Sequence, residues 1–293
     1  YKAIFLGGGA SLQFGMIPMN FLAGGAADYV NTGEWAKKAI KEAKRFGTVN
    51  VAGSAEDKNF SYIPALPSLK LSPSAKYVHI TTNETISGTR WNAFPDTGAV
   101  PLFADMSSEI GSRVIDPKRF ALIYAGAQKN LGPAGVTLVI IREDLLSKCP
   151  DNIVTVLNYK TQVEKDSLYN TPPVFAIYIL GLVLKWLKKQ GGLKGIEAIN
   201  NEKARLLYEV IDATGFYRGT AARADRSTMN VTFRLKTEEL EAKFLEESKK
   251  AGFVGLKGHR SVGGCRASIY NAFPLTGVKD LVAFMKKFES ANS

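Results

Sequence analysis

Residues 121–142, ALIYAGAQKNLGPAGVTLVIIR, decide the fold class because they place a lysine between two apolar strands. The flanking runs Ala121–Gly126 and Val136–Arg142 are rich in strand-forming residues, and the turn between them is rich in glycine. Lys129 is therefore expected at a strand end, in a partly dry place. Desolvation lowers the pKa of a lysine, and the neutral amine condenses with aldehydes, so the position suits a Schiff base. The alternative is an ordinary surface lysine on a turn.

Similar apolar runs alternate with helical periodicity over residues 1–192, which is typical of a mostly parallel sheet wrapped by helices. This pattern predicts a large α/β domain. Beyond Gly191 and Gly192 the pattern is of α+β type and predicts a smaller domain over residues 193–293. The expected strands are Ala3–Leu6, Thr48–Ala52, Tyr77–Thr81, Val100–Asp105, Ala121–Gly126, Val136–Arg142 and Met229–Leu235. The expected helices are Ser11–Ala23, Glu34–Phe46, a long apolar helix after Thr171, Ile196–Thr214, Glu238–Ala251 and Val278–Ser290.

An aspartate, Asp105, ends the expected strand that precedes the strand leading to Lys129. Ligands of open α/β sheets bind at the carboxyl ends of the strands, so the two side chains are expected to face one crevice. A carboxylate beside a pyridinium nitrogen keeps that nitrogen protonated and makes the ring an electron sink. Asp105 suits that role, although an aspartate that caps the following turn is an equally good reading of this position alone.

A glycine-rich turn, Gly7–Gly9, joins the first expected strand to the first expected helix. Glycines allow backbone N–H groups to approach a phosphate, and the positive end of a helix favours the same ligand. Ala10 and Ser11 are therefore candidates for holding a phosphate. The segment satisfies neither the P-loop nor the GxGxxG pattern.

Composition and charge restrict the classes of protein. The chain has 293 residues, of which 45% are hydrophobic. No apolar run approaches the ~20 residues of a membrane span, so we expect no membrane partner. The formal charge of +11 fits nucleic acid, an acidic surface or small anionic substrates. The densest basic stretch, residues 37–45, has helical spacing and is interpreted as a solvated helix face, so we expect no nucleic-acid partner.

The two cysteines, Cys149 and Cys265, lie far apart without CxxC spacing, and only two histidines could assist them. We therefore expect neither a zinc site nor a disulfide framework, which fits a reducing cytoplasm. The chain opens directly on an expected strand, without an initial methionine or the layout of a signal peptide. We expect that a segment upstream has been removed, and such a segment could have carried organellar targeting.

These segments together resemble the phosphoserine aminotransferase branch of the class V aminotransferases, which are fold-type I pyridoxal-phosphate enzymes. The likeness runs over essentially the whole chain: the family's lysine falls on Lys129 in AGAQKNLGPAG and its aspartate on Asp105 in ADMSS. The resemblance implies pyridoxal 5′-phosphate as cofactor and a homodimer with shared active sites. The other cofactor-binding residues that it implies are Ala10 and Ser11 in GGASLQF, Trp35 in NTGEWAKKA, Thr85 in TTNETISGT, Gln128, and Asn170 and Thr171 in SLYNTPP. In the family, Trp35 stacks on the pyridine ring, and Asn170 and Thr171 reach the cofactor phosphate of the neighbouring subunit.

The resemblance also implies the reaction, which transfers an amino group between glutamate and 3-phosphohydroxypyruvate in serine biosynthesis and gives phosphoserine and 2-oxoglutarate. The segment GLKGHRSVGGCRASIYNA supplies Arg266 for the substrate α-carboxylate, where the planar guanidinium allows bidentate binding. His259 and Arg260 form a positive pair for the substrate phosphate. The family's second pair, an upstream His-Arg, does not occur in this sequence. We therefore expect half of that phosphate site here.

Two alternatives remain at this point. A cysteine desulfurase shares the fold, and Cys265 lies directly before Arg266, but those enzymes usually place a histidine where this chain has Gln128. An N-terminally truncated, non-catalytic relic or binding module of the same fold would explain the missing upstream pair and the high positive charge. Such a protein would be colourless and would shift nucleic acid in a gel.

Overall fold

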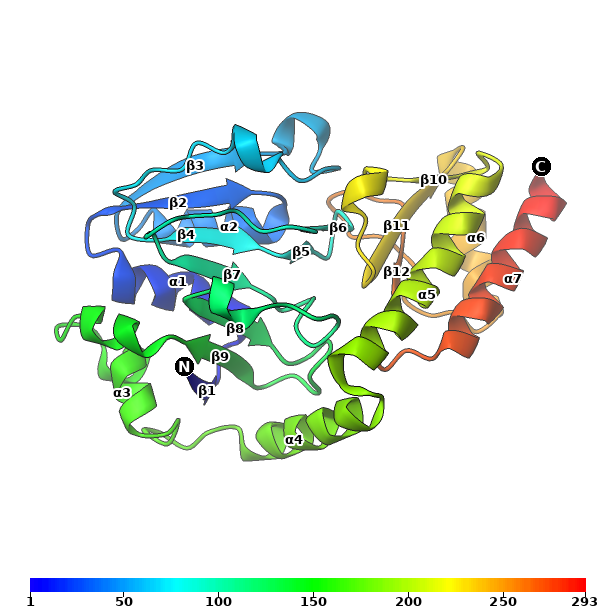
Figure 1. Cartoon of the computed structure of the whole chain (residues 1–293). Coiled ribbons are helices and arrows are strands. Elements are labelled where there is room, and N and C mark those ends of the chain that lie inside the picture. The colour runs from blue at the N-terminus through cyan, green and yellow to red at the C-terminus, as the bar shows by residue number, and fades with distance from the viewer.

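The computed structural model describes residues 1–293, and its larger part is built around a seven-stranded sheet. Its strands follow the order β1-β9-β8-β7-β4-β2-β3, and only β9 runs against the others. The strands are β1 (Lys2–Leu6), β2 (Ala26–Asn31), β3 (Thr48–Ser54), β4 (Val78–Thr81), β7 (Leu102–Asp105), β8 (Leu122–Gly126) and β9 (Thr137–Ile141). The expected α/β class with a mostly parallel seven-stranded sheet is confirmed (Figure 1).

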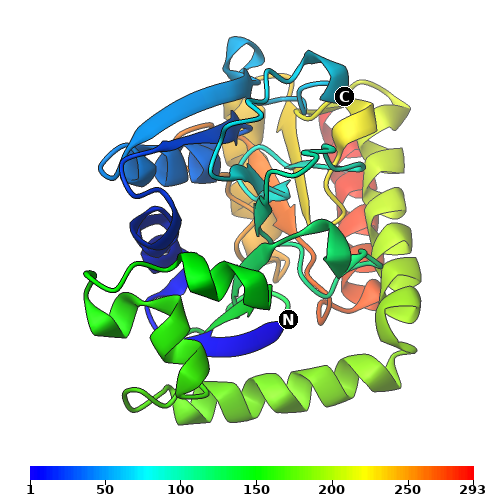
Figure 2. The same cartoon turned by 60° about the vertical axis from the view of Figure 1, so that its left-hand side comes forward.

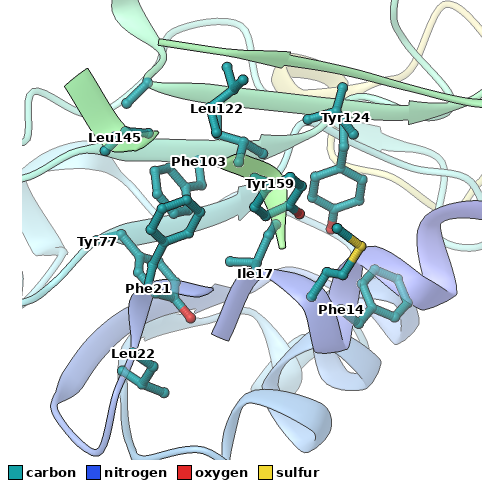
Figure 3. Close-up of a cluster of buried hydrophobic side chains, with 14 of the residues drawn as sticks. Phe14, Ile17, Phe21, Leu22, Tyr77, Phe103, Leu122, Tyr124, Leu145 and Tyr159 are labelled. Atoms are coloured by element: carbon teal, nitrogen blue, oxygen red, sulfur yellow. The ribbon is translucent and has the colours of Figure 1, made fainter. Parts of the chain in front are cut away.

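Both faces of the sheet are buried: successive residues of one strand belong to two different hydrophobic clusters, one on each face. Phe103 and Tyr124 pack with α1 (Gly9–Phe21), α2 (Glu34–Ala43) and α3 (Tyr159–Glu164) on one face. Leu102 and Ile123 pack on the opposite face against the connecting segments. On the helical side Phe21 stacks on Tyr159, with ring centroids 5.6 Å apart (Figure 3). Successive side chains of a strand point to opposite faces of the sheet. Because both faces are buried here, these strands are continuously apolar.

One central strand was missed in the sequence: β2 lies between β4 and β3. Its sequence, AADYVN, contains Asp28, which is fully buried. The Asp28 carboxylate accepts hydrogen bonds from the Asn50 side chain and from the backbone N–H of Ser72. A buried carboxylate is tolerated because these distant donors satisfy it, and the local sequence does not show them.

A three-stranded antiparallel sheet with the order β10-β11-β12 forms the C-terminal part of the chain. Its strands are β10 (Tyr217–Gly219), β11 (Asn230–Leu235) and β12 (Cys265–Ser268), of which only β11 was expected. The helices α5 (Gly192–Ala213), α6 (Glu238–Lys250) and α7 (Leu275–Asn292) cover this sheet (Figure 2). Strands β10 and β12 are short, which explains why periodicity did not reveal them.

Most of the other expected elements occur with shifted ends. The first helix begins at Gly9 and ends at Phe21, two residues before the expected limits, because it starts within the glycine-rich turn itself. Gly8 adopts φ +84°, and a Cβ there would lie 2.6 Å from the Cβ of Leu12, so only glycine fits. The second helix ends at Ala43, before the expected Phe46. The strand ending at Asp105 begins at Leu102, after Pro101.

The long apolar helix, α4 (Val174–Lys189), lies along the outer edge of the molecule and leads into α5 (Figures 1 and 2). Many of its apolar side chains face away from the chain: Phe175 is 73% exposed and Tyr178 62%. No helix in the structure has both the length and the apolar character needed to cross a membrane.

Candidate active site

The carboxyl ends of four parallel strands and their following turns meet in one place. Asp105 ends β7, Lys129 follows β8, Thr81 ends β4, and the first turn of α1 follows β1. These groups line a cavity of about 150 Å³. Its lining consists of Gly9, Ala10, Ser11, Trp35, Thr81, Asn83, Asp105, Ser107, Ser108, Gln128 and Lys129. Six residues singled out in the sequence, Ala10, Ser11, Trp35, Asp105, Gln128 and Lys129, are therefore brought together.

Lys129 lies in a mixed environment of burial and charge. Its Nζ donates a hydrogen bond to Oγ1 of Thr85 over 3.2 Å and lies 5.5 Å from the centroid of the Trp35 ring. Burial lowers the pKa of the Lys129 ammonium, and the positive charge of Arg266 acts in the same direction. The carboxylates of Asp105 and Glu84 oppose this shift. The net lowering increases the fraction of neutral amine, as the strand-end position predicts.

Asp105 lines the same cavity, accepts hydrogen bonds there and is 4% exposed. Its Oδ1 accepts the backbone N–H of Ser107 over 2.8 Å. Burial raises the pKa of the Asp105 carboxyl, while the hydrogen bonds from Ser107 and the charge of Lys129 act against this rise. A cationic ring nitrogen in the cavity would favour the ionised carboxylate further.

The structure fits a phosphorylated aromatic aldehyde at this place. The N–H groups of Gly9, Ala10 and Ser11 begin α1 and have no carbonyl one turn earlier to bind, and no side chain caps this end. Two buried polar atoms of the lining, Nε1 of Trp35 and Oγ1 of Thr81, have no hydrogen-bond partner. Such orphaned groups in a native site are explained by a polar ligand.

A second cavity, of about 440 Å³, lies between the three-stranded sheet and two segments of the larger part of the chain, the one that follows β3 and the turn at Ile86 and Ser87. It is lined by four cationic side chains, Lys58, Arg218, Arg234 and Arg266, and by no carboxylate. The Nε atom of Arg266 is buried without a partner. An anionic substrate group is the ligand that this charge distribution favours.

The remaining candidates lie outside the first cavity. His259 and Arg260 are on the loop before β12, where Nδ1 of His259 lies 2.7 Å from the hydroxyl of Ser261, and the neighbouring Gly258 lines the second cavity. Asn170 and Thr171 border a different hollow, beside the outer side of the turn at Gly7 and Gly8. A single chain therefore does not bring them to Lys129.

Sequence reasoning missed several residues of the site, namely Thr81, Asn83, Glu84, Ser107 and Ser108. Glu84 lies against the N-terminus of α2, and burial raises its pKa to about 7, with a contribution from Asp105 in the same direction. All five end β4 or β7 or lie within the few residues that follow the carboxyl ends of these two strands. This topological position was a usable signal, because that edge is where ligands of such sheets bind.

Cys265 has the character of a structural thiol. It is 2% exposed, and burial raises its pKa to about 12. Attack by cysteine requires the thiolate, so this environment disfavours a desulfurase-type role. No group of three His, Cys, Asp or Glu side chains in the structure is arranged to hold a metal ion.

We predict that Arg266→Gln raises the pKa of Lys129, because it removes a positive charge that disfavours the ammonium. The measurement is the pH dependence of Lys129 acetylation in the cofactor-free protein, followed by peptide mass spectrometry. The midpoint is expected at higher pH than in the unchanged chain. Arg142→Gln is the control, because Arg142 pairs with Asp144 at the surface, and its midpoint should equal that of the unchanged chain. A midpoint unmoved by Arg266→Gln contradicts the coupling.

The comparisons with known proteins agree on one family. The model of the family "Aminotransferase class-V" matches residues 1–281. The chain is 59% identical to the phosphoserine aminotransferase of Desulfosudis oleivorans over 295 residues, which covers 100% of this chain and 81% of the relative. It is 56% identical to that of Niallia circulans, covering 99% of this chain and 80% of the relative.

Solved structures give the same result. The phosphoserine aminotransferase from Bacillus circulans subsp. alkalophilus superposes with a TM-score of 0.98 at 55% identity, covering 100% of this chain and 81% of that one. A pyridoxal-phosphate-bound phosphoserine aminotransferase from Trichomonas vaginalis has a TM-score of 0.91 at 41% identity, covering 97% and 82%. Another solved phosphoserine aminotransferase, 50% identical, is described for its Schiff base.

Proposed function

This chain belongs to the class V aminotransferase family and has the function of a phosphoserine aminotransferase, and we propose which of its residues carry the reaction. The reaction exchanges an amino group between glutamate and 3-phosphohydroxypyruvate, giving 2-oxoglutarate and phosphoserine. The observation that supports our assignment is the convergence of Lys129, Asp105 and the first turn of α1 on one cavity. When bound there, pyridoxal 5′-phosphate supplies an aldehyde that bonds covalently to amines and a ring that accepts electron density.

Each residue of the site has a distinct task in this proposal. Lys129 would anchor the cofactor, and its neutral amine would take the proton from the substrate α-carbon and return it during the transfer. Asp105 holds a proton on the ring nitrogen through its charge. Ala10 and Ser11 bind the phosphate by backbone N–H groups, and the indole of Trp35 covers one face of the ring.

The substrates are bound by cations of the second cavity and its border. Arg266 binds the α-carboxylate, which explains its unpartnered Nε, and His259 with Arg260 binds the distal phosphate or carboxylate. Glutamate and phosphoserine share this pattern of two anionic ends.

A visible spectrum with and without glutamate tests cofactor binding and amino transfer together. The purified protein supplied with pyridoxal phosphate should show an absorbance that sodium borohydride fixes. Glutamate should shift that absorbance, and 3-phosphohydroxypyruvate should restore it. A protein that binds the cofactor but shows no glutamate-dependent shift would disprove the transaminase assignment.

A homodimer with shared active sites is part of the proposal. Phe175 and Tyr178 on α4, together with Leu168 at 67% and Val174 at 64% exposure, form an apolar surface that a partner subunit would cover. Asn170 and Thr171 lie directly beside this surface, which suits the role of contacting the partner's cofactor phosphate.

Cytoplasmic location is also proposed, and the two free cysteines are consistent with it.

We predict that Phe175→Asp converts the dimer to a monomer and lowers cofactor affinity, because burying an unpaired carboxylate in an interface of ~2,000 Å² or more is strongly unfavourable. Analytical ultracentrifugation measures the mass of each variant. Val254→Asp is the matched control, since Val254 is 83% exposed on the C-terminal part of the chain, and this variant should stay dimeric. Retention of the dimer in Phe175→Asp would place the interface elsewhere.

A further inference from the structure

Glu84 is a buried carboxylate that the steps above do not use. It ends the short strand β5 (Asn83–Glu84) and is fully buried. Its carboxylate accepts the backbone N–H groups of Ala36 over 3.1 Å and Trp35 over 3.4 Å. The hydroxyl of Thr32 donates to the same carboxylate over 3.5 Å. All of these donors belong to the N-terminus of α2 or to the residues just before it.

Helix α2 has no local cap, and Glu84 takes the place of one. The residue at the N-cap position is Gly33, which has no side chain to accept the first N–H groups. These N–H groups have no partner within the helix, and the positive end of the helix favours a carboxylate. A Cβ at Gly33 would lie 2.5 Å from Cδ of Glu84, so the glycine leaves the room that this carboxylate occupies.

The same residue connects two sides of the cofactor cavity. Trp35, whose N–H Glu84 accepts, is the aromatic wall of the cavity. Thr85, which follows Glu84 in the chain, accepts the hydrogen bond from Lys129. A movement of Glu84 would therefore change the position of the indole relative to the Lys129 amine.

We propose that Glu84 is a positioning residue that fixes the N-terminus of α2, and through it the indole of Trp35, opposite Lys129. It does not touch substrate or reacting atoms. The inference rests on the proposed function, because the ring that Trp35 covers is that of the cofactor.

The test compares Glu84→Ala and Glu84→Gln with the unchanged chain in three measurements: the dissociation constant of pyridoxal phosphate, the induced circular dichroism of the bound cofactor, and kcat and KM. Losing the acceptor of two N–H groups should weaken cofactor binding roughly tenfold or more in Glu84→Ala. The dichroic band should shrink, and kcat should fall more than KM changes. Glu84→Gln keeps one carbonyl acceptor and should restore part of each loss.

A double-mutant cycle identifies the route of the effect. If Glu84 acts through the indole, Glu84→Ala should cost little additional cofactor affinity in a Trp35→Ala background. Gly33→Ala gives a second approach that keeps the carboxylate but displaces it, and we expect the same loss of dichroism. This variant also serves if Glu84→Ala does not fold.

Thr237→Ala is the matched control, because Thr237 caps α6 by accepting the N–H of Leu240, in the C-terminal part of the chain. It should lower the melting temperature and leave cofactor affinity and dichroism unchanged. Additive losses in the cycle, or Glu84 variants that change only the melting temperature, would overturn the proposal. An unchanged chain that binds no cofactor would instead refute the proposed function.

Discussion

Lys129→Ala should abolish the absorbance that borohydride fixes and should lower transamination by roughly 10⁴-fold or more, because in the proposed reaction the Lys129 amine is both anchor and proton carrier. The folded structure should survive, since Lys129 makes one side-chain hydrogen bond, to Thr85. The measurements are the visible spectrum before and after borohydride treatment and single-turnover kinetics with glutamate. A yellow, reducible variant would refute the assignment.

The chain offers a stringent internal control for this experiment. Lys203 is a second buried lysine, and burial lowers its pKa to about 8. Its Nζ donates to the carbonyls of Ile269, Tyr270 and Phe273, so it lines no cofactor cavity. Peptide mapping after borohydride reduction should therefore find the cofactor on Lys129 and not on Lys203. Labelling of Lys203 would show that a lowered pKa alone selects the lysine.

Asp105→Asn should fold but lose activity by roughly 10²–10³-fold or more, since a preorganised charge at a reacting centre is typically worth ~3–4 kcal/mol. The amide oxygen can still accept the N–H of Ser107, so the local turn should remain. What is lost is the negative charge beside the ring nitrogen. Steady-state kinetics and the cofactor dissociation constant measure the effect, and near-normal turnover would eliminate the proposed role.

Asp28→Asn is the control for Asp105→Asn, because it removes a buried negative charge from the same sheet outside the cavity. Asp28 is a fully buried aspartate of the same sheet, on β2, whose carboxylate is satisfied by Asn50 and Ser72. Its replacement should lower the free energy of unfolding while turnover stays unchanged. Equal losses of activity in Asp28→Asn and Asp105→Asn would mean that any buried carboxylate of this sheet supports catalysis indirectly.

The sequence alone predicted the α/β class, which the structure confirms, and the position of Lys129 at the end of a strand. Both depend on local patterns: apolar strands of period two, the glycine-rich turns around Gly8 and Lys129, and an aspartate at a strand end. Parallel strands place their carboxyl ends at one edge, so the sequence alone predicts that Asp105 and Lys129 lie close together. The roles of His259, Arg260 and Arg266 came from family likeness and not from spacing.

Tertiary structure decided the elements whose stability depends on distant partners. Strand β2 contains buried Asp28, which is stable there because Asn50 and Ser72 donate to it, and no local pattern predicts such pairing. The cap of α2 is similar. Glu84, on strand β5, accepts the N–H of Ala36 and occupies the space that the absence of a side chain at Gly33 leaves open. A residue far along the chain can satisfy a buried polar group as well as a near one, so only the folded chain shows which residue does so.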